Sequence, residues 1–142
     1  MPVTLYSYLN SLPELTGRVF MTAVKDTPAP PYAYVFEAPG GKELEFYGTL
    51  EAMRVFPRVA LFDKPTGTDT PQSRAAAQQR LRALVTRIQN EVVTVVDTHA
   101  DGVTPLIRGS FQRQNEPAVR DDDKVPGQSY ATLMFTGLIW RA

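Results

Sequence analysis

The spacing of apolar residues along the chain predicts two helices. Between residues 4 and 12, apolar side chains recur every three or four positions, which places them on one face of a short helix that Pro13 ends. Residues 71–90 repeat the pattern over a longer segment, with Thr70 as the N-cap and Pro71 at the first helical position. The expected core-facing residues are Leu5, Tyr8, Leu9 and Leu12 in the first helix, and Ala77, Leu81, Leu84, Val85 and Ile88 in the second.

Short runs of branched and aromatic residues predict strands between and after these helices. The turn signal Pro39-Gly40-Gly41 indicates that the second and third strands form a pair. Pro57 cannot donate to a strand ladder, so we expect it at an edge, at a bulge or before its strand proper. Both faces of the last strand are largely apolar, which is typical of a central strand or of a strand covered on both sides. The expected strands are residues 18–21, 32–36, 44–47, 54–63, 91–97, 106–112 and 129–140.

The order of these elements predicts the fold class. Strands come in runs rather than alternating with helices, which favours an α+β fold. We expect one domain over residues 1–142, with a mostly antiparallel β-sheet on which the long helix and the short N-terminal helix pack.

Composition removes several classes of function. The chain has no Cys, so a thiolate nucleophile, a disulfide framework and a Cys-ligated metal site are excluded. Fifteen basic and fifteen acidic residues give zero net charge, which argues against a general nucleic-acid or membrane-surface binder. Apolar runs are strand-sized and the N-terminus has no signal-peptide pattern, so we expect cytosolic synthesis and no membrane partner.

One segment has the spacing of metal ligands. In an extended strand, Asp97, His99 and Asp101 would point to one face and could converge on a cation. The alternative, which we favour, is a strand that ends in a polar turn, because the sequence holds no second His to complete a site. There is no Gly-x-Ser-x-Gly elbow and no phosphate-binding Gly-rich loop. We therefore expect no catalytic residue, no cofactor and no metal.

Charge is separated along this neutral chain. The long helix carries Arg74, Arg80, Arg82 and Arg87, of which Arg80 and Arg87 share nearly one azimuth. The loop at 114–128 carries an acidic run. Two ordinary solvated surfaces would explain this, and so would contact of the helix with DNA phosphates. The sharper hypothesis is that these two faces meet between neighbouring subunits. The interface residues that it predicts are Arg74, Arg80, Arg87, Asp121, Asp122 and Asp123.

The layout of the chain resembles that of a known protein family. The features that carry this resemblance are Leu12-Pro13-Glu14-Leu15, Gly17-Arg18-Val19-Phe20, Pro31-Tyr32-Ala33-Tyr34-Val35, Arg58-Val59-Ala60-Leu61-Phe62, the long helix with its Ala-rich start, and the terminal strand from Tyr130 to Trp140. In this order they resemble the small tail-terminator and tail-completion (neck) proteins of long-tailed bacteriophages and of related contractile or gene-transfer particles.

The resemblance implies a structural virion protein without an active site or cofactor. Such a subunit forms a six-fold ring that caps the tail tube, stops its polymerisation and offers a surface to the head connector or stopper protein. DNA would pass through the lumen without sequence-specific contacts, and the protein would assemble in the host cytoplasm into the tail or neck of the virion. The alternatives are another head–tail joining or minor tail protein, or a small ligand- or metal-binding α+β domain.

Overall fold

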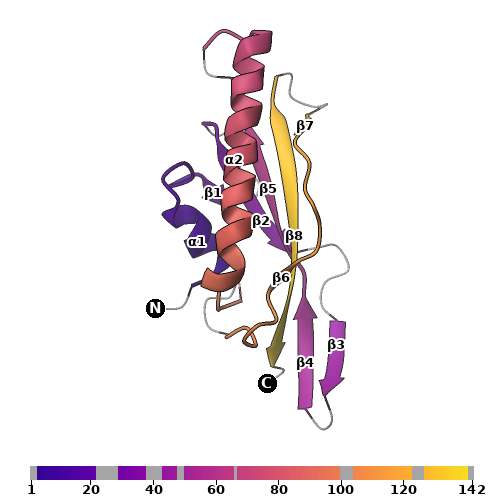
Figure 1. The fold of residues 1–142 in the computed structure, drawn as a ribbon. Coiled ribbons are helices and arrows are strands. Elements are labelled where there is room, and N and C mark those ends of the chain that lie inside the picture. Colours follow the sequence, from indigo (N-terminus) through magenta and orange to yellow (C-terminus); the bar gives the residue numbers. More distant parts are fainter. Residues whose placement is uncertain are drawn as a thin grey trace.

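The computed structural model of the chain describes residues 3–21, 29–37, 43–47, 50–65, 67–99, 104–122 and 127–140. It contains two helices, α1 (Leu5–Ser11) and α2 (Pro71–Val95), and one sheet of eight strands (Figure 1). The strands are β1 (Val19–Phe20), β2 (Tyr32–Glu37), β3 (Glu43–Tyr47), β4 (Leu50–Val55), β5 (Pro57–Asp63), β6 (Gln112–Arg113), β7 (Arg120–Asp121) and β8 (Ser129–Trp140). The prediction of an α+β fold with a mostly antiparallel sheet is confirmed, since only the β1–β2 pair is parallel among the described strands.

The long strand β8 organises the sheet. On one edge it pairs with β4 and then with β5, and the two pairings share one continuous register that is interrupted only around Phe56 and Pro57. Strand β2 pairs with the free edge of β5, and β3 pairs with the free edge of β4. The short strands β6 and β7 pair with β8 as well. Strand β8 is therefore central, which is one of the two alternatives that its apolar faces predicted.

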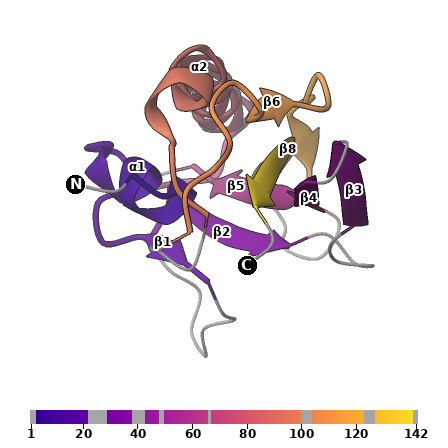
Figure 2. The same cartoon turned by 90° about the horizontal axis from the view of Figure 1, so that it is seen from below.

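Both helices lie on the same side of the sheet (Figure 2). Thr70 and Ser73 form a capping box at the start of α2, with Pro71 in the first turn, and Thr4 and Ser7 do the same for α1. The buried faces of the helices, the alternate residues of β2, β5 and β8, and the connections between them form one hydrophobic core. Its fully buried members include Leu9, Leu15, Ala33, Val59, Leu61, Leu81, Ile88, Val92, Ala131 and Leu133.

The strand predicted at residues 91–97 is wrong. Helix α2 continues through the β-branched residues up to Val95. Val92 lies four residues after Ile88, and both side chains are fully buried in the core. Continuing the helix keeps Val92 on the buried stripe, and this packing outweighs the intrinsic β-propensity of the segment.

The expected pairing of the second and third strands is also wrong. Strand β2 pairs with β5, whereas β3 pairs with β4, which begins at Leu50, ahead of the strand predicted at 54–63. Pro57 opens β5 after a break at Phe56, one of the positions expected for it. Of the strand predicted at 106–112, only a bridge from Leu106 to Ile139 and the start of β6 are present. The turn Pro39-Gly40-Gly41 lies outside the described residues.

Candidate functional site

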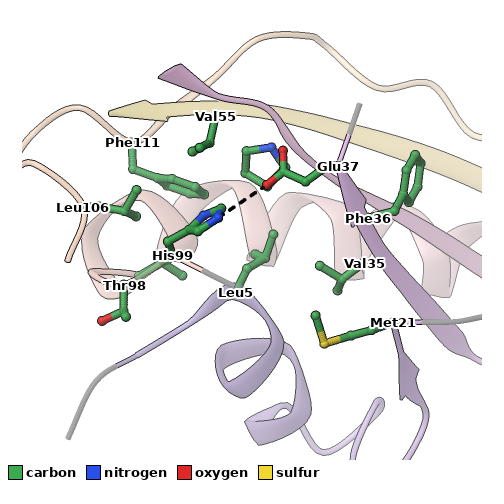
Figure 3. A pocket seen from close by; sticks show the side chains of 12 residues that line it. Leu5, Met21, Val35, Phe36, Glu37, Val55, Thr98, His99, Leu106 and Phe111 are labelled. Atoms are coloured by element: carbon green, nitrogen blue, oxygen red, sulfur yellow. Dashed lines mark ion pairs between the residues drawn. The ribbon is translucent and has the colours of Figure 1, made fainter. Parts of the chain in front are cut away.

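An apolar cavity of about 270 Å³ opens at the end of the molecule where α2 stops, between α1, β2, the β4–β5 junction and the segment that follows α2 (Figure 3). We call it the Glu37 cavity. Its apolar walls include Leu5, Val35, Val55, Val96, Leu106 and Phe111, and its polar groups are Glu37, Thr98 and His99. The cavity is thus mostly hydrocarbon with a few polar groups, the composition that is usual for ligand-binding and docking pockets.

Glu37 is held in the cavity by the break in the neighbouring strand. It is the last residue of β2 and lies opposite Pro57, at the point where β4 gives way to β5. Its Oε2 accepts the backbone N–H of Phe56 at 3.1 Å, so the carboxylate satisfies a donor at the interrupted part of the strand. This contact leaves the other oxygen, Oε1, directed into the cavity.

His99 approaches that oxygen from the segment after α2. Its backbone N–H donates to the carbonyl of Thr104 at 2.8 Å, and Thr98 next to it bridges to Pro105, which fixes the segment as a short antiparallel pair. The Nε2 atom lies 4.0 Å from Glu37 Oε1, the contact drawn as a dashed line in Figure 3. That distance is too long for a hydrogen bond, and the two groups form an ion pair only when His99 is protonated.

Two of the three residues that the sequence offered as possible metal ligands have other partners in the structure. Asp97 accepts the backbone N–H of Val3 and the hydroxyl of Thr98, each at 2.7 Å, and these hydrogen bonds hold the pKa of its carboxyl below its usual value. His99 instead faces Glu37, while Asp101 lies outside the described residues. Among the described residues no group of three or more His, Cys, Asp or Glu side chains could hold a metal ion.

A second cavity, of about 380 Å³, lies between α2 and the segment that joins α1 to β1. We call it the arginine cavity, because Arg18, Arg80 and Arg87 line it together with Glu14 and Asp63. Arg80 binds the buried carboxylate of Asp63 with two N–O distances of 3.1 and 3.2 Å. Arg87 contacts Glu14 and Glu91, each at 3.4 Å. Two of the three predicted interface arginines therefore share this cavity.

The third predicted arginine, Arg74, lies nearer the start of α2. Its guanidinium binds both carboxylate oxygens of Asp69, at 2.6 and 2.7 Å. This contact lowers the pKa of Asp69 and, with a smaller effect of Asp121, raises that of Arg74. Because both side chains are exposed, the pair contributes little to stability.

The acidic loop lies beside α2 in the same chain. Asp121 accepts a hydrogen bond from Gln78 of α2 at 3.1 Å, and Asp122 accepts one from Gln128 at 2.9 Å. Asp123 lies outside the described residues. Helix and loop are thus already neighbours within one subunit, which the sequence-based hypothesis did not include.

Sequence reasoning missed three residues that define these cavities, Glu37, Asp63 and Arg18. Glu37 and Asp63 each end a strand that is rich in apolar residues. A charged residue directly after a predicted core strand is a signal that could have marked them as candidate site residues. Arg18 donates to the carbonyl of Pro30 at 3.1 Å, a contact across the connection between β1 and β2 that no local pattern reveals.

Comparisons with known proteins assign no family to the chain. No family model matches it, and no curated protein matches it. A chain in the solved structure of the virion of a native gene transfer agent (GTA) particle is similar over 87% of this chain and 79% of that chain. The TM-score of this match is 0.46 and the identity 15%, too low to transfer a function. In the described part of the chain, no helix is long and apolar enough to cross a membrane.

Proposed function

We propose that this chain is a structural virion protein of the tail-terminator type. In this proposal it forms a homo-oligomeric ring, hexameric as in the family that it resembles, which caps a tail tube and joins it to a head connector or stopper protein. The ring works through shape and contact surfaces, without an active site or a cofactor, and DNA passes its lumen without sequence-specific contacts.

The observation that carries the proposal is the face of the sheet opposite the helices. Both described helices lie on one side of the sheet, and the other side presents half-buried aromatic residues in mutual contact, among them Tyr34, Phe62 and Tyr130. Phe36 and Trp140, which alternate onto that same side, are 40% and 48% exposed. Tyr34, Phe62 and Tyr130 form one contiguous aromatic surface, and Trp140 is a separate exposed ring at the other end of β8. Exposed apolar surface usually marks a contact with another protein.

The distribution of charge supports lateral contact between subunits. Arg80 and Arg87 line one open cavity, and the acidic residues Asp121 and Asp122 lie elsewhere along α2 and β8. We propose that the arginine cavity of one subunit faces acidic residues of its neighbour, and that the predicted interface residues Arg74 and Asp123 take part in this contact as well. Such complementarity between two different patches produces head-to-tail assembly, which closes into a ring when the rotation permits.

The test is the assembly state of the purified chain. Native mass spectrometry and negative-stain electron microscopy over a wide concentration range should show a hexamer with an open centre. A chain that stays monomeric at every concentration would contradict the proposal. Oligomers without a lumen would instead favour another head–tail joining or minor tail protein.

A further inference from the structure

The Glu37 cavity contains a hydrogen-bond acceptor that the chain itself does not satisfy. Among the described side chains, Glu37 Oε1 is the buried polar atom without a hydrogen-bond partner. His99, the nearest cation when protonated, stands 4.0 Å away and is nine-tenths buried. An acceptor that is removed from water and left unpaired destabilises the fold, so the cavity favours an occupant that brings a donor.

The walls of the cavity define the rest of that occupant. They are apolar, and at the rim Met21 is 49% exposed and Phe36 is 40% exposed. The volume of about 270 Å³ lies just below the ~300–1,000 Å³ typical of sites for small-molecule ligands. One large side chain with an apolar body and a single donor at its tip matches these dimensions and this chemistry.

Trp140 has the complementary properties. It is the only Trp of the chain, it ends β8, and it is 48% exposed although it is the largest side-chain type. An indole combines a broad apolar ring with one N–H donor. Because it has no acceptor, it would bring no lone pair that repels the Glu37 carboxylate.

Within one chain, Trp140 and the Glu37 cavity lie on opposite faces of the sheet. A Cβ on Gly137 would meet Val55, Leu106 and Phe111, which all line the cavity, so position 137 of β8 faces the cavity side. Side chains alternate along a strand, which directs position 140 to the other face. The cavity is lined by Val96, which follows α2, and Trp140 ends β8. The C-terminal ends of α2 and β8 lie toward the same end of the molecule (Figure 1).

We infer that Trp140 of one subunit inserts into the Glu37 cavity of the next subunit and donates its indole N–H to Glu37 Oε1. This inference rests on the proposed ring and specifies one of its contacts. Because the contact joins two different patches, each subunit gives one Trp140 and receives another, the arrangement that a closed ring requires.

Two substitutions test the two sides of the contact. Trp140→Ala removes the inserted ring. Glu37→Gln keeps an oxygen for the Phe56 N–H and replaces Oε1 with an amide N–H₂, so that a donor faces the indole donor. Each should raise the concentration at half-assembly by roughly tenfold or more, as expected for the loss of one buried charge-assisted hydrogen bond. The matched controls, Tyr6→Ala for an exposed aromatic residue and Glu116→Gln for an exposed carboxylate, should assemble like the wild type.

Mixing the two variants gives a sharper outcome. A Trp140→Ala subunit still has an intact cavity, and a Glu37→Gln subunit still has its tryptophan, so the second can insert into the first, and assembly stops at this one contact. Native mass spectrometry of the mixture should show a 1:1 heterodimer that neither variant forms alone. Absence of the heterodimer, or rings from either variant at wild-type concentration, would overturn the inference.

A third measurement separates this inference from the proposed function. His99 is the only His of the chain, so its imidazole resonances report on the cavity. In monomeric Trp140→Ala protein, N-acetyltryptophanamide should shift them, and the added Glu37→Gln substitution should weaken that binding. If the wild type forms rings and the probe leaves His99 unchanged, the contact is wrong and the ring stands. If the probe binds and the wild type stays monomeric, the ring is wrong and the cavity's preference for an indole stands.

Discussion

Arg80 forms a bidentate ion pair with Asp63, which ends β5 and whose side chain is 1% exposed. The Asp63 carboxylate also accepts the backbone N–H of Lys64 at 2.8 Å. This pair ties α2 to the sheet and forms one wall of the arginine cavity. A buried carboxylate that loses its cationic partner keeps its desolvation cost, so the pair should matter for folding as well as for any contact with a neighbour.

Arg80→Met should therefore destabilise the fold. We expect the free energy of unfolding to fall by about 2 kcal/mol, less than the ~3–5 kcal/mol for breaking a fully buried pair because the guanidinium is half exposed. Urea denaturation followed by circular dichroism measures the change. Arg82→Met is the matched control, since Arg82 is exposed on the same helix. Equal midpoints for the two variants would show that the ion pair does not anchor α2.

Gly137→Ala should tighten the packing beside the Glu37 cavity. The new Cβ would lie 3.0 Å from Leu106 Cδ2, so the leucine side chain must give way by a few tenths of an ångström. The distance of 3.4 Å to Phe111 Cδ2 is an ordinary van der Waals contact. We expect a loss of about 1 kcal/mol, at the low end for overpacking because the end of a leucine side chain can move. Thermal denaturation checks this loss, and weaker binding of N-acetyltryptophanamide would show that Leu106 moves into the cavity. A variant as stable as the wild type, with unchanged binding, would contradict this packing.

Tyr8→Phe should alter the response to alkaline pH. The Tyr8 hydroxyl donates to Glu91 at 3.0 Å, and burial first, then this carboxylate, raise the pKa of Tyr8 above its usual value. A raised folded-state pKa gives stability that is complete below the unfolded value of about 10 and is lost as the pH rises further. At neutral pH the free energy of unfolding of the variant should be about 1 kcal/mol lower than that of the wild type. This difference should become smaller above about pH 10. The control is Tyr6→Phe at an exposed position, and a deficit independent of pH would disprove the coupling.

Asp97→Asn should make the protein less sensitive to acid. Asp97 ties the N-terminal segment to the end of α2 through Val3, and its hydrogen bonds lower its pKa. A lowered folded-state pKa gives stability that is present above the unfolded value of about 3.9 and is lost as the pH falls through the folded pKa. The wild type should therefore lose its advantage over the variant on acidification, as measured by unfolding midpoints at several pH values. Glu116→Gln serves as the control, and a constant difference would exclude this linkage.

Arg87→Glu should weaken assembly more than folding. Arg87 is partly exposed and holds its two acidic neighbours only at 3.4 Å, so it remains available to a partner. Reversing its charge should raise the concentration at half-assembly roughly tenfold at low salt, with a smaller effect at high salt, because screening weakens exposed contacts. Sedimentation at two salt concentrations measures this, with Arg82→Glu as the control on another azimuth of α2. Unchanged assembly of Arg87→Glu at low salt would remove Arg87 from the interface.

Local patterns in the sequence determined the elements whose cause is local. The spacing of Leu5, Tyr8 and Leu9 defined α1, and Thr70 with Pro71 marked the start of α2, because caps and helical periodicity depend on near neighbours. The long run of branched and aromatic residues predicted β8 with its correct bounds. A central place was one of the two alternatives that its apolar faces predicted. The α+β class followed from the order of these elements.

Only the tertiary structure decided which elements meet. Burial of Val92 in the core extended α2 through a segment with strand propensity, and β5 rather than β3 became the partner of β2. Glu37, His99 and the Phe56 N–H come together from three distant segments, as do Arg80 and Asp63. Such contacts depend on how faces pack across the sheet, and a single sequence carries no local signal for them. Sequence therefore determined α1, the start of α2, β8 and the fold class, while packing between the segments created both cavities.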